Sequence, residues 1–359
     1  AKYQKLPSFL ADSLPDDWGN QLFECWRTQN RIANGDITPL EKLAFIGKRG
    51  MGALEFLPPA AVDLEEPFKV EIAELYKLAQ LALSEAKSFK SAIHPDLMIE
   101  SLFKVGTSAG GRRPKAIINL NQETGECYSG QVATQMPGFV PMLIKFDEHS
   151  DIPTTRIEYS YYLMAKDVGL NMMPSYLMEG DDTAHFLTQR FDRQDGKKIH
   201  TQTLAAMKPT ASSYEDLFEV AYRISILPAE IKQLFLLTTM NVLGGNVDDH
   251  TKNFSFMMSD DGVWHIAPAY DYTFSVDLSA PGYMNRHSMT INNKNADIQR
   301  TDLLELAKRY NVKGADSIIG KAIAVVSNYE HYAAQAGVSP HWTQTIKEEI
   351  AFRVQGLDL

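Results

Sequence analysis

The sequence has little cysteine, no long apolar run and no excess of positive charge. Cys25 and Cys127 are its two cysteines, with no CxxC pair and no Cys and His run at zinc-ligand spacing, so both are expected to be reduced thiols. No window approaches the roughly 18 apolar residues of a membrane span, and residues 1–30 lack the pattern of a signal peptide. We therefore expect a cytoplasmic protein without membrane contact.

The balance of charge bears on nucleic-acid binding. The chain has 35 basic and 45 acidic residues, and its formal net charge of −10 opposes non-specific attraction to phosphates. Any contact with DNA is therefore expected to be indirect, through a basic partner.

The 359 residues, 44% of them hydrophobic, are enough to bury a large core and predict two lobes.

The spacing of apolar residues predicts a strand-containing first part and a helical second part. Residues 1–60 read as a helical preface with Gly-rich turns, and a helix is expected through about Phe89. Short segments bounded by turns then predict a small antiparallel sheet, and they read SLFKVG, KAIINL, GECYSGQVAT, MLIKF and HFLTQRFDR. We expect an α+β fold, with a first lobe at residues 1–191 and a mainly helical second lobe at residues 192–359.

The most informative segment is LGGNVDDHTKNFSFMMSDDGVWHIAPAYDYT, residues 243–273. Two apolar runs flank an Asp-Asp-Gly turn and predict a β-hairpin. Antiparallel strands of similar length end side by side, so Asn253 and Asp271 are expected to be neighbours, with Asp248 close to both.

These residue types suit phosphoryl transfer from ATP with Mg²⁺. Kinases place an Asp that orients the substrate hydroxyl five residues before a metal-binding Asn, and a later Asp completes the site. Asp248 is therefore the candidate catalytic residue, and Asn253 and Asp271 are candidate metal ligands. His250 either braces this loop or transfers a proton, and Asp249 is expected to be exposed. The alternative is that each residue only forms or caps a turn.

Two features predict a phosphate site, namely a lysine within a strand and the Gly-rich segment GTSAGGRRPK, residues 106–115. Small residues let main-chain N–H groups converge on an anion. Lys145 places an ammonium group in an apolar strand, and Glu158 opens the next helical stretch, as in the Lys–Glu pair of kinases. The alternatives are a Gly-rich turn with exposed arginines and a snorkelling lysine at a sheet edge. The residues of this segment expected to contact ATP are Ser108, Ala109, Gly110, Gly111 and Lys115.

The segments SAGGRRPK, GNVDDHTKNFS and APAYDYT, in this order, resemble the HipA family of bacterial kinases, and FLADSLPDDWG near the start resembles it too. The resemblance implies a two-lobed, protein-kinase-like α+β fold related to phosphatidylinositol kinases. It implies that Asp248 is catalytic, that Lys145 contacts the ATP phosphates and that Ser108 is autophosphorylated. Gln189 to Phe191 would form the hinge at adenine. Family members often have Glu at the position of Gln189, whose main chain can still meet the base.

The same resemblance implies the biological role and the partners. We expect a serine/threonine protein kinase that is the toxin of a toxin–antitoxin pair and acts in bacterial persistence. Its protein substrate is expected to be a translation factor such as an aminoacyl-tRNA synthetase, and a helix-turn-helix antitoxin of the HipB type is expected to contact the DNA. A small-molecule kinase and a catalytically silent nucleotide-binding protein remain open as alternatives.

The start of the chain departs from the family pattern. Typical members carry a small N-terminal domain before the stretch that FLADSLPDDWG resembles, and here this stretch begins almost at once. The expectation is that the domain is absent from this sequence, either trimmed or supplied by a separate small protein.

Overall fold

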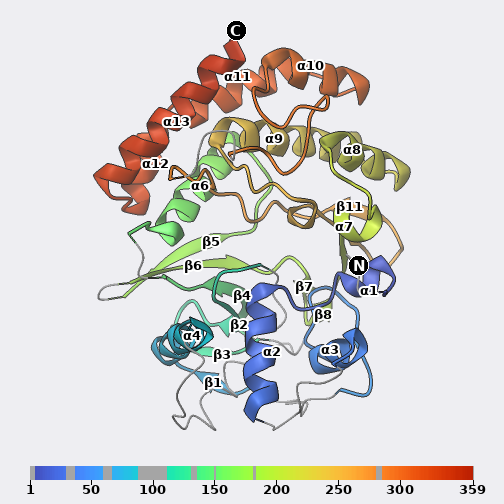
Figure 1. Cartoon of the computed structure of the whole chain (residues 1–359), viewed down its shortest axis with the longest axis vertical. Coiled ribbons are helices and arrows are strands. Elements are labelled where there is room, and N and C mark those ends of the chain that lie inside the picture. Colours follow the sequence, from blue (N-terminus) through green and yellow to red (C-terminus); the bar gives the residue numbers. More distant parts are fainter. Residues whose placement is uncertain are drawn as a thin grey trace. The chain divides into compact units, whose positions relative to one another are not determined.

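The computed structural model shows two compact units, each described here by itself (Figure 1). The described residues are 5–29, 37–59, 67–87, 111–130, 136–148, 151–180, 183–279 and 285–358. The first unit consists of Ala1–Glu148 and Met178–Thr201, and the second of His149–Leu177 and Gln202–Leu359.

A six-stranded sheet is the main feature of the first unit, with its strands in the order β1-β3-β2-β4-β6-β5. The strands are β1 (Lys69–Val70), β2 (Lys115–Leu120), β3 (Cys127–Ser129), β4 (Val140–Lys145), β5 (Ser175–Glu179) and β6 (Ala184–Gln189). The pairs β1–β3, β2–β3, β2–β4 and β4–β6 are antiparallel. The predicted sheet is confirmed for KAIINL, MLIKF and parts of GECYSGQVAT and HFLTQRFDR, whereas SLFKVG lies outside the described residues.

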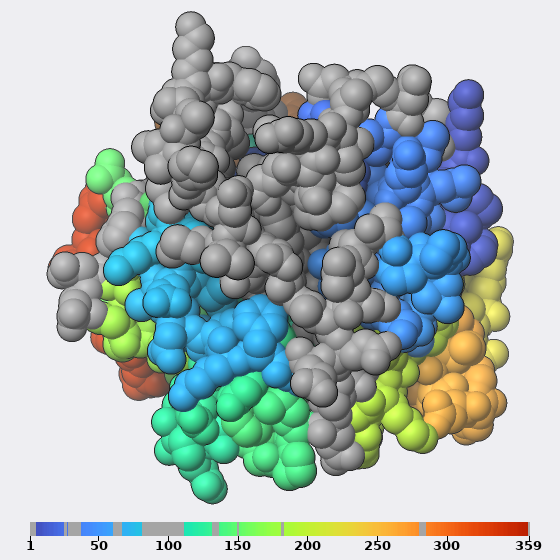
Figure 2. Space-filling view, turned by 90° about the horizontal axis from the view of Figure 1, so that it is seen from below, coloured from blue at the N-terminus to red at the C-terminus, as the bar shows by residue number. Residues whose placement is uncertain are grey.

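Four helices from the described part of the first 87 residues belong to this unit, and α2 and α4 share a core with the sheet. They are α1 (Ser8–Ala11), α2 (Asp17–Gln29), α3 (Pro39–Ile46) and α4 (Ile72–Lys87). Thr38 begins α3 with a capping box, in which its side chain accepts from the Glu41 N–H and the Glu41 carboxylate accepts from the Thr38 N–H. Trp18 of α2 and Leu75 and Leu78 of α4 are buried in one core with β2 and β4. The light-blue atoms of α4 lie at the surface in Figure 2.

The second unit is mainly helical, as predicted. Its helices are α6 (Thr154–Val168), α7 (Leu204–Met207), α8 (Tyr214–Arg223), α9 (Pro228–Gly244), α10 (Arg300–Arg309), α11 (Ala315–Val326), α12 (Tyr329–Ala336) and α13 (Pro340–Asp358). Pro228 begins α9, and Gly245 ends it with a left-handed φ of 67°. Most of α9 is buried, so it forms the centre of this unit. Among the helices of the described residues, none is long and apolar enough to cross a membrane.

The two units differ from a simple division after Phe191. Helix α6 belongs to the second unit because it packs on α11 and α12. Tyr161 of α6 lies 5.1 Å from Tyr272 and 5.9 Å from Tyr329, measured between ring centroids. Its hydroxyl donates to the carbonyl of Gly244 at the end of α9. Helical spacing alone predicts α6 but not the core in which its apolar face is buried.

Replacement of Phe235 in α9 tests the importance of this core. Phe235 is fully buried, so Phe235→Ala should leave a cavity and lower the free energy of unfolding by about 3–5 kcal/mol. Phe352 of α13 is 69% exposed, and Phe352→Ala is the matched control with an expected change below about 0.5 kcal/mol. Urea unfolding measures both. Equal losses for the two variants would contradict the central position of α9.

Candidate functional site

The predicted hairpin is present in the second unit. Strand β10 (Ser255–Met258) pairs antiparallel with β11 (Trp264–Ile266), with Phe256 opposite Ile266. A short 3-10 helix, Thr251–Asn253, lies directly before β10. The two strands therefore return the chain to the region of this helix, as the sequence pattern predicted.

Hydrogen bonds join the returning chain to the loop before the hairpin. The Ala267 N–H donates to the Ser255 carbonyl at 2.9 Å, and the Tyr270 hydroxyl donates to the Lys252 carbonyl at 2.7 Å. The side-chain amide of Asn246 donates to the Asp271 carbonyl at 3.4 Å. Asp271 has a φ of 51°, in the left-handed region that Asp tolerates better than most residues. The backbone at Asp271 is thus held beside the loop that contains Asp248.

Asp248 is exposed, but its main chain is held on both sides. Its N–H donates to the Ser275 hydroxyl at 3.0 Å, and its carbonyl accepts from the Asn253 side-chain amide at 2.8 Å. This bond uses the nitrogen of the amide, so Asn253 Oδ1 is the atom that suits a cation. His250 is exposed as well, and its carbonyl accepts from the Asn253 N–H at 2.8 Å. The loop therefore brings Asp248, His250 and Asn253 together.

Asp249 is fully buried, so the expectation that it is exposed was wrong. Its carboxylate accepts from the Tyr214 hydroxyl at 2.6 Å and from the Ser288 N–H at 2.7 Å, and it bonds His287 Nδ1 at 2.8 Å. Burial and this carboxylate raise the pKa of Tyr214 far above its usual value, which keeps the hydroxyl protonated as a donor. These partners are distant in the sequence, and therefore a local reading of the turn did not reveal them. Asp249 fixes the loop from inside.

Two buried asparagines, which were not predicted from the sequence as functional residues, extend this network. The Asn241 side-chain amide donates to the Tyr214 hydroxyl at 3.0 Å. The Asn246 amide donates to Asn241 Oδ1 at 3.0 Å, and Asn246 Oδ1 accepts from the Ser275 hydroxyl at 3.2 Å. Because Ser275 also accepts from the Asp248 N–H, the network links α8 and α9 to the candidate catalytic loop. The only signal in the sequence was an Asn inside the apolar run of α9.

In the first unit, two lysines occupy directly opposed positions on neighbouring strands. Lys115 of β2 pairs with Lys145 of β4, and their relative exposures are 3% and 8%. Lys145 Nζ lies 5.9 Å from the centroid of the Phe186 ring on β6. A buried ammonium group needs hydrogen-bond acceptors or negative charge close to it. A Cβ on Gly111 would lie 2.6 Å from Lys115 Nζ, so glycine permits the close approach of this lysine.

Gln189 ends β6, opposite Met142 of β4. Gln189 and Phe191 are half-buried, whereas Arg190 and Asp192 are buried. The side chains of the predicted hinge thus alternate between partly exposed and buried positions.

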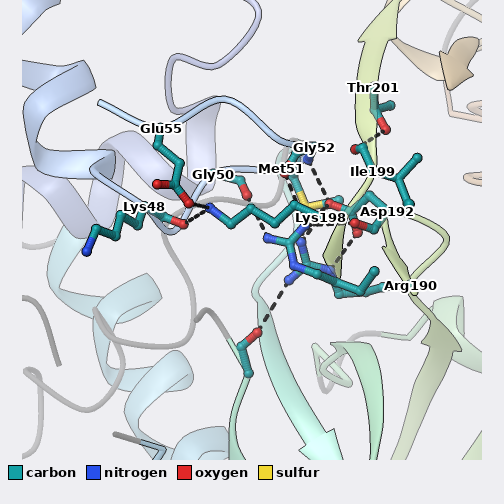
Figure 3. A network of polar contacts seen from close by, with 12 residues as sticks. Lys48, Gly50, Met51, Gly52, Glu55, Arg190, Asp192, Lys198, Ile199 and Thr201 are labelled. Atoms are coloured by element: carbon teal, nitrogen blue, oxygen red, sulfur yellow. Dashed lines mark hydrogen bonds and ion pairs between the residues drawn. The ribbon is translucent and has the colours of Figure 1, made fainter. Parts of the chain in front are cut away.

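The buried side chains after β6 form a charged cluster, shown in Figure 3. Asp192 accepts from Arg190 at 2.8 and 2.7 Å, from Arg193 at 2.9 Å and from the Gly52 N–H at 2.7 Å. Burial opposes ionisation of Asp192, but the two guanidinium groups outweigh it and lower the pKa to about 2. Burial and repulsion by Arg190 lower the pKa of Arg193 to about 10, so Arg193 stays charged at neutral pH. The cluster is a buried ion group on the segment that follows the predicted hinge.

Several predicted contacts stay proposals. Ser108, Ala109 and Gly110 lie outside the described residues. Lys145 belongs to the first unit and Glu158 to the second, so their ion pair stays a prediction. Within the described parts of the chain, no group of three or more His, Cys, Asp or Glu gathers as a metal site. The Asn and Asp ligand set therefore stays a proposal.

Comparison with known families and structures identifies the group of proteins to which this fold and site belong. The model of the HipA-like C-terminal domain matches residues 107–334, and the model of the HipA N-terminal domain matches residues 1–57. The chain belongs to the HipA family. The expectation that the N-terminal domain is absent was wrong: it placed the domain ahead of FLADSLPDDWG, whereas the match includes that stretch.

A solved structure and a curated relative extend this comparison. The structure of HipA from Shewanella oneidensis MR-1, determined with HipB and operator DNA, is 17% identical with a TM-score of 0.66 and covers 99% of this chain and 85% of that one. This likeness confirms the α+β fold. Y4mE of Sinorhizobium fredii, named provisionally as a kinase, is 26% identical over 268 residues, 68% of this chain. The chain spans 60% of the length of that relative.

A partial likeness to the proinflammatory kinase CtkA of Helicobacter pylori is weaker. It covers 61% of this chain and 85% of that one, at 17% identity. Its TM-score of 0.41 supports no conclusion about this chain.

The neighbouring residues Asp248 and Asp249 provide a matched test of the buried brace. Asp249→Asn should lower the free energy of unfolding by roughly 1–3 kcal/mol. The amide NH₂ of the variant would face the groups that donate hydrogen bonds to the wild-type carboxylate. Asp248→Asn, at the exposed position, should leave the free energy of unfolding nearly unchanged. Urea unfolding distinguishes them, and a larger loss for Asp248→Asn would refute the assignment.

The charged cluster predicts a specific response to acid. The pKa of Asp192 is about 2 in the folded chain, whereas an aspartate in an unfolded chain has a pKa of roughly 3.9. At a pH above the unfolded-state pKa, ionised Asp192 therefore stabilises the fold by on the order of 2 kcal/mol. This contribution is lost as the pH falls from about 4 through about 2. The difference in free energy of unfolding between wild type and Asp192→Asn should therefore shrink on acidification. A constant difference across this range of pH would contradict the pKa assignment.

Proposed function

We propose that this chain is an ATP- and Mg²⁺-dependent serine/threonine protein kinase. Its membership of the HipA family supports this activity. The observation that carries the proposal is the loop in which exposed Asp248 is followed directly by buried Asp249. A group that acts on a substrate hydroxyl must be accessible and must also be held in position, and this arrangement meets both requirements.

In the proposed reaction, Asp248 orients the substrate hydroxyl and accepts its proton. The hydroxyl oxygen forms a bond to the γ-phosphorus of ATP as the bond from this phosphorus to the bridging oxygen breaks, which releases ADP. Asn253 supports Asp248 through the bond from its amide to the Asp248 carbonyl. His250 stands beside them on the exposed side of the loop, where it assists the proton transfer.

The proposed metal ligands are Asn253 and Asp271. Carboxylate and amide oxygens are the protein ligands that Mg²⁺ prefers, and Asn253 Oδ1 remains after the amide nitrogen has bonded Asp248. When bound, Mg²⁺ neutralises charge on the ATP phosphates. The positive φ of Asp271, held by Asn246, supports a role that depends on a fixed carboxylate direction.

The proposed ATP contacts in the first unit depend on the lysine pair. Two buried lysines at opposed positions on neighbouring strands concentrate positive charge there, and positive charge suits the phosphates of ATP, which supports a phosphate-binding role for Lys115 and Lys145. Gln189 and Phe191 are proposed to meet the adenine base, and Glu158 to pair with Lys145. The remaining proposed contacts are Ser108, Ala109, Gly110 and Gly111.

The biological role that we propose is that of a toxin neutralised by an antitoxin. The solved structure of the Shewanella protein contains HipB and operator DNA, and a HipB-type partner would give this acidic chain its indirect contact with DNA. A translation factor such as an aminoacyl-tRNA synthetase is the proposed substrate. Autophosphorylation of Ser108 is proposed to switch the enzyme off, because added negative charge beside the phosphates repels ATP.

The Asp248→Asn variant tests the kinase proposal. Labelled ATP, Mg²⁺ and a bacterial lysate should yield labelled proteins and a phosphate on Ser108 with wild type. The variant should transfer phosphate about 10²–10⁴ times more slowly while it binds ATP as before, because it keeps the proposed metal ligands. Asp195→Asn is the matched control, exposed and in the first unit, and should keep full activity.

The result has clear alternatives. Label in low-mass compounds instead of proteins would favour a small-molecule kinase. A folded Asp248→Asn variant with nearly normal phosphotransfer would remove the catalytic assignment.

A further inference from the structure

The N-terminal segment, defined as the described residues among 1–57, contacts the chain directly after the predicted hinge at Gln189 to Phe191. Within the first unit, the Gly52 N–H donates to Asp192 at 2.7 Å, and Arg193 donates to the carbonyls of Gly50 at 3.0 Å and Gly52 at 3.1 Å. Figure 3 shows Gly50 and Gly52 directed toward the charged cluster around Asp192. Lys198 adds an ion pair to Glu55 at 2.7 Å. The turn 50–52 is therefore bonded through its main chain to charged side chains that are buried.

The same N-terminal segment contacts the other proposed ATP-binding stretch. The Asp16 carboxylate accepts from the Gly111 N–H at 3.1 Å, and the Trp18 N–H donates to the Gly111 carbonyl at 3.2 Å. The Trp18 indole donates to the Lys115 carbonyl at 2.9 Å, and this side chain is fully buried. The described end of the Gly-rich segment is thus bonded at both Gly111 and Lys115.

We propose that the N-terminal segment is a two-point clamp on the ATP site, and this inference rests on the proposed function. One point, Asp16 and Trp18, positions the phosphate-binding residues Gly111 and Lys115. The other point, the turn 50–52, positions the adenine-binding residues Gln189 to Phe191 through Asp192 and Arg193. The clamp residues are positioning residues, since they act on ATP through the segments that they hold.

The contacts at both points are of a kind that transmits small displacements. At the hinge point, ionised side chains bond main-chain groups away from water, and such charge-assisted bonds are stronger than neutral ones. Arg190 and Asp192 alternate in sequence with Gln189 and Phe191, so a shift of the buried side chains moves the partly exposed ones. Errors of about 1 Å in the placement of binding groups are costly to enzymes.

Two substitutions separate the two points. Gly52 has a φ of 71°, which strains any other residue, and a Cβ there would lie 3.2 Å from both N and O of Thr201, so Gly52→Ala should disturb the packing of the turn against Thr201. Asp16→Ala removes the acceptor of the Gly111 N–H. Gly125→Ala is the control, because Gly125 has a similar φ of 75° with nothing within 4 Å of the added Cβ.

Calorimetry with fragments of ATP measures each point. Gly52→Ala should weaken binding of adenosine roughly tenfold and leave inorganic tripolyphosphate unchanged, whereas Asp16→Ala should do the reverse. For both variants KM for ATP should rise while kcat at saturating ATP changes little. Gly125→Ala should match wild type throughout. Thermal unfolding confirms that each variant is folded, and either variant alone decides the point that it tests.

The outcomes separate the clamp from the kinase proposal. If each variant weakened both fragments equally, or if both variants bound them as wild type does, the clamp would be wrong while ATP binding stood. If wild type bound neither ATP nor its fragments, the proposed function would fail and the clamp with it.

Discussion

Charge that is removed from water needs donors or counter-charges at the same place, and a buried carboxylate in each unit meets this constraint. In the first unit, Asp192 accepts from two arginines and from the Gly52 N–H. In the second, Asp249 accepts from Tyr214 and Ser288 and bonds His287. Each carboxylate joins segments far apart in the sequence, and losing a donor would leave charge uncompensated. The loops that carry the candidate functional residues are therefore fixed by buried charge as well as by apolar packing.

Local patterns in the sequence predicted the elements whose stability depends on near neighbours. The hairpin around the Asp-Asp-Gly turn follows from turn chemistry. The same rules could not reveal that Asp249 is buried, since its partners lie 35 to 39 residues away. The N-terminal domain was missed for a different reason, because FLADSLPDDWG lies inside this domain and does not follow it.

Strand register is another feature that local patterns do not determine. KAIINL and MLIKF each predict a strand, but a shift of one residue would place their lysines on opposite faces of the sheet. The structure pairs Lys115 with Lys145, and this register places the two buried lysines opposite each other. Two lysines that face each other concentrate positive charge where a phosphate-binding site would need it. The register thus supports the proposed phosphate site more strongly than either lysine does by itself.

Asp248 and Asp249 have the same side chain, but the side chain of Asp248 is exposed and that of Asp249 is buried. Asp249 is surrounded by donors, which hold its carboxylate and leave it little freedom to act on a substrate. Asp248 is exposed, while its main chain is tied to Ser275 and Asn253. A positioned group has little reorganisation to undergo when it meets a hydroxyl, which lowers the barrier to reaction. Under the proposed function, the hydrogen bonds that hold buried Asp249 therefore allow Asp248 to be accessible to a substrate and fixed in position.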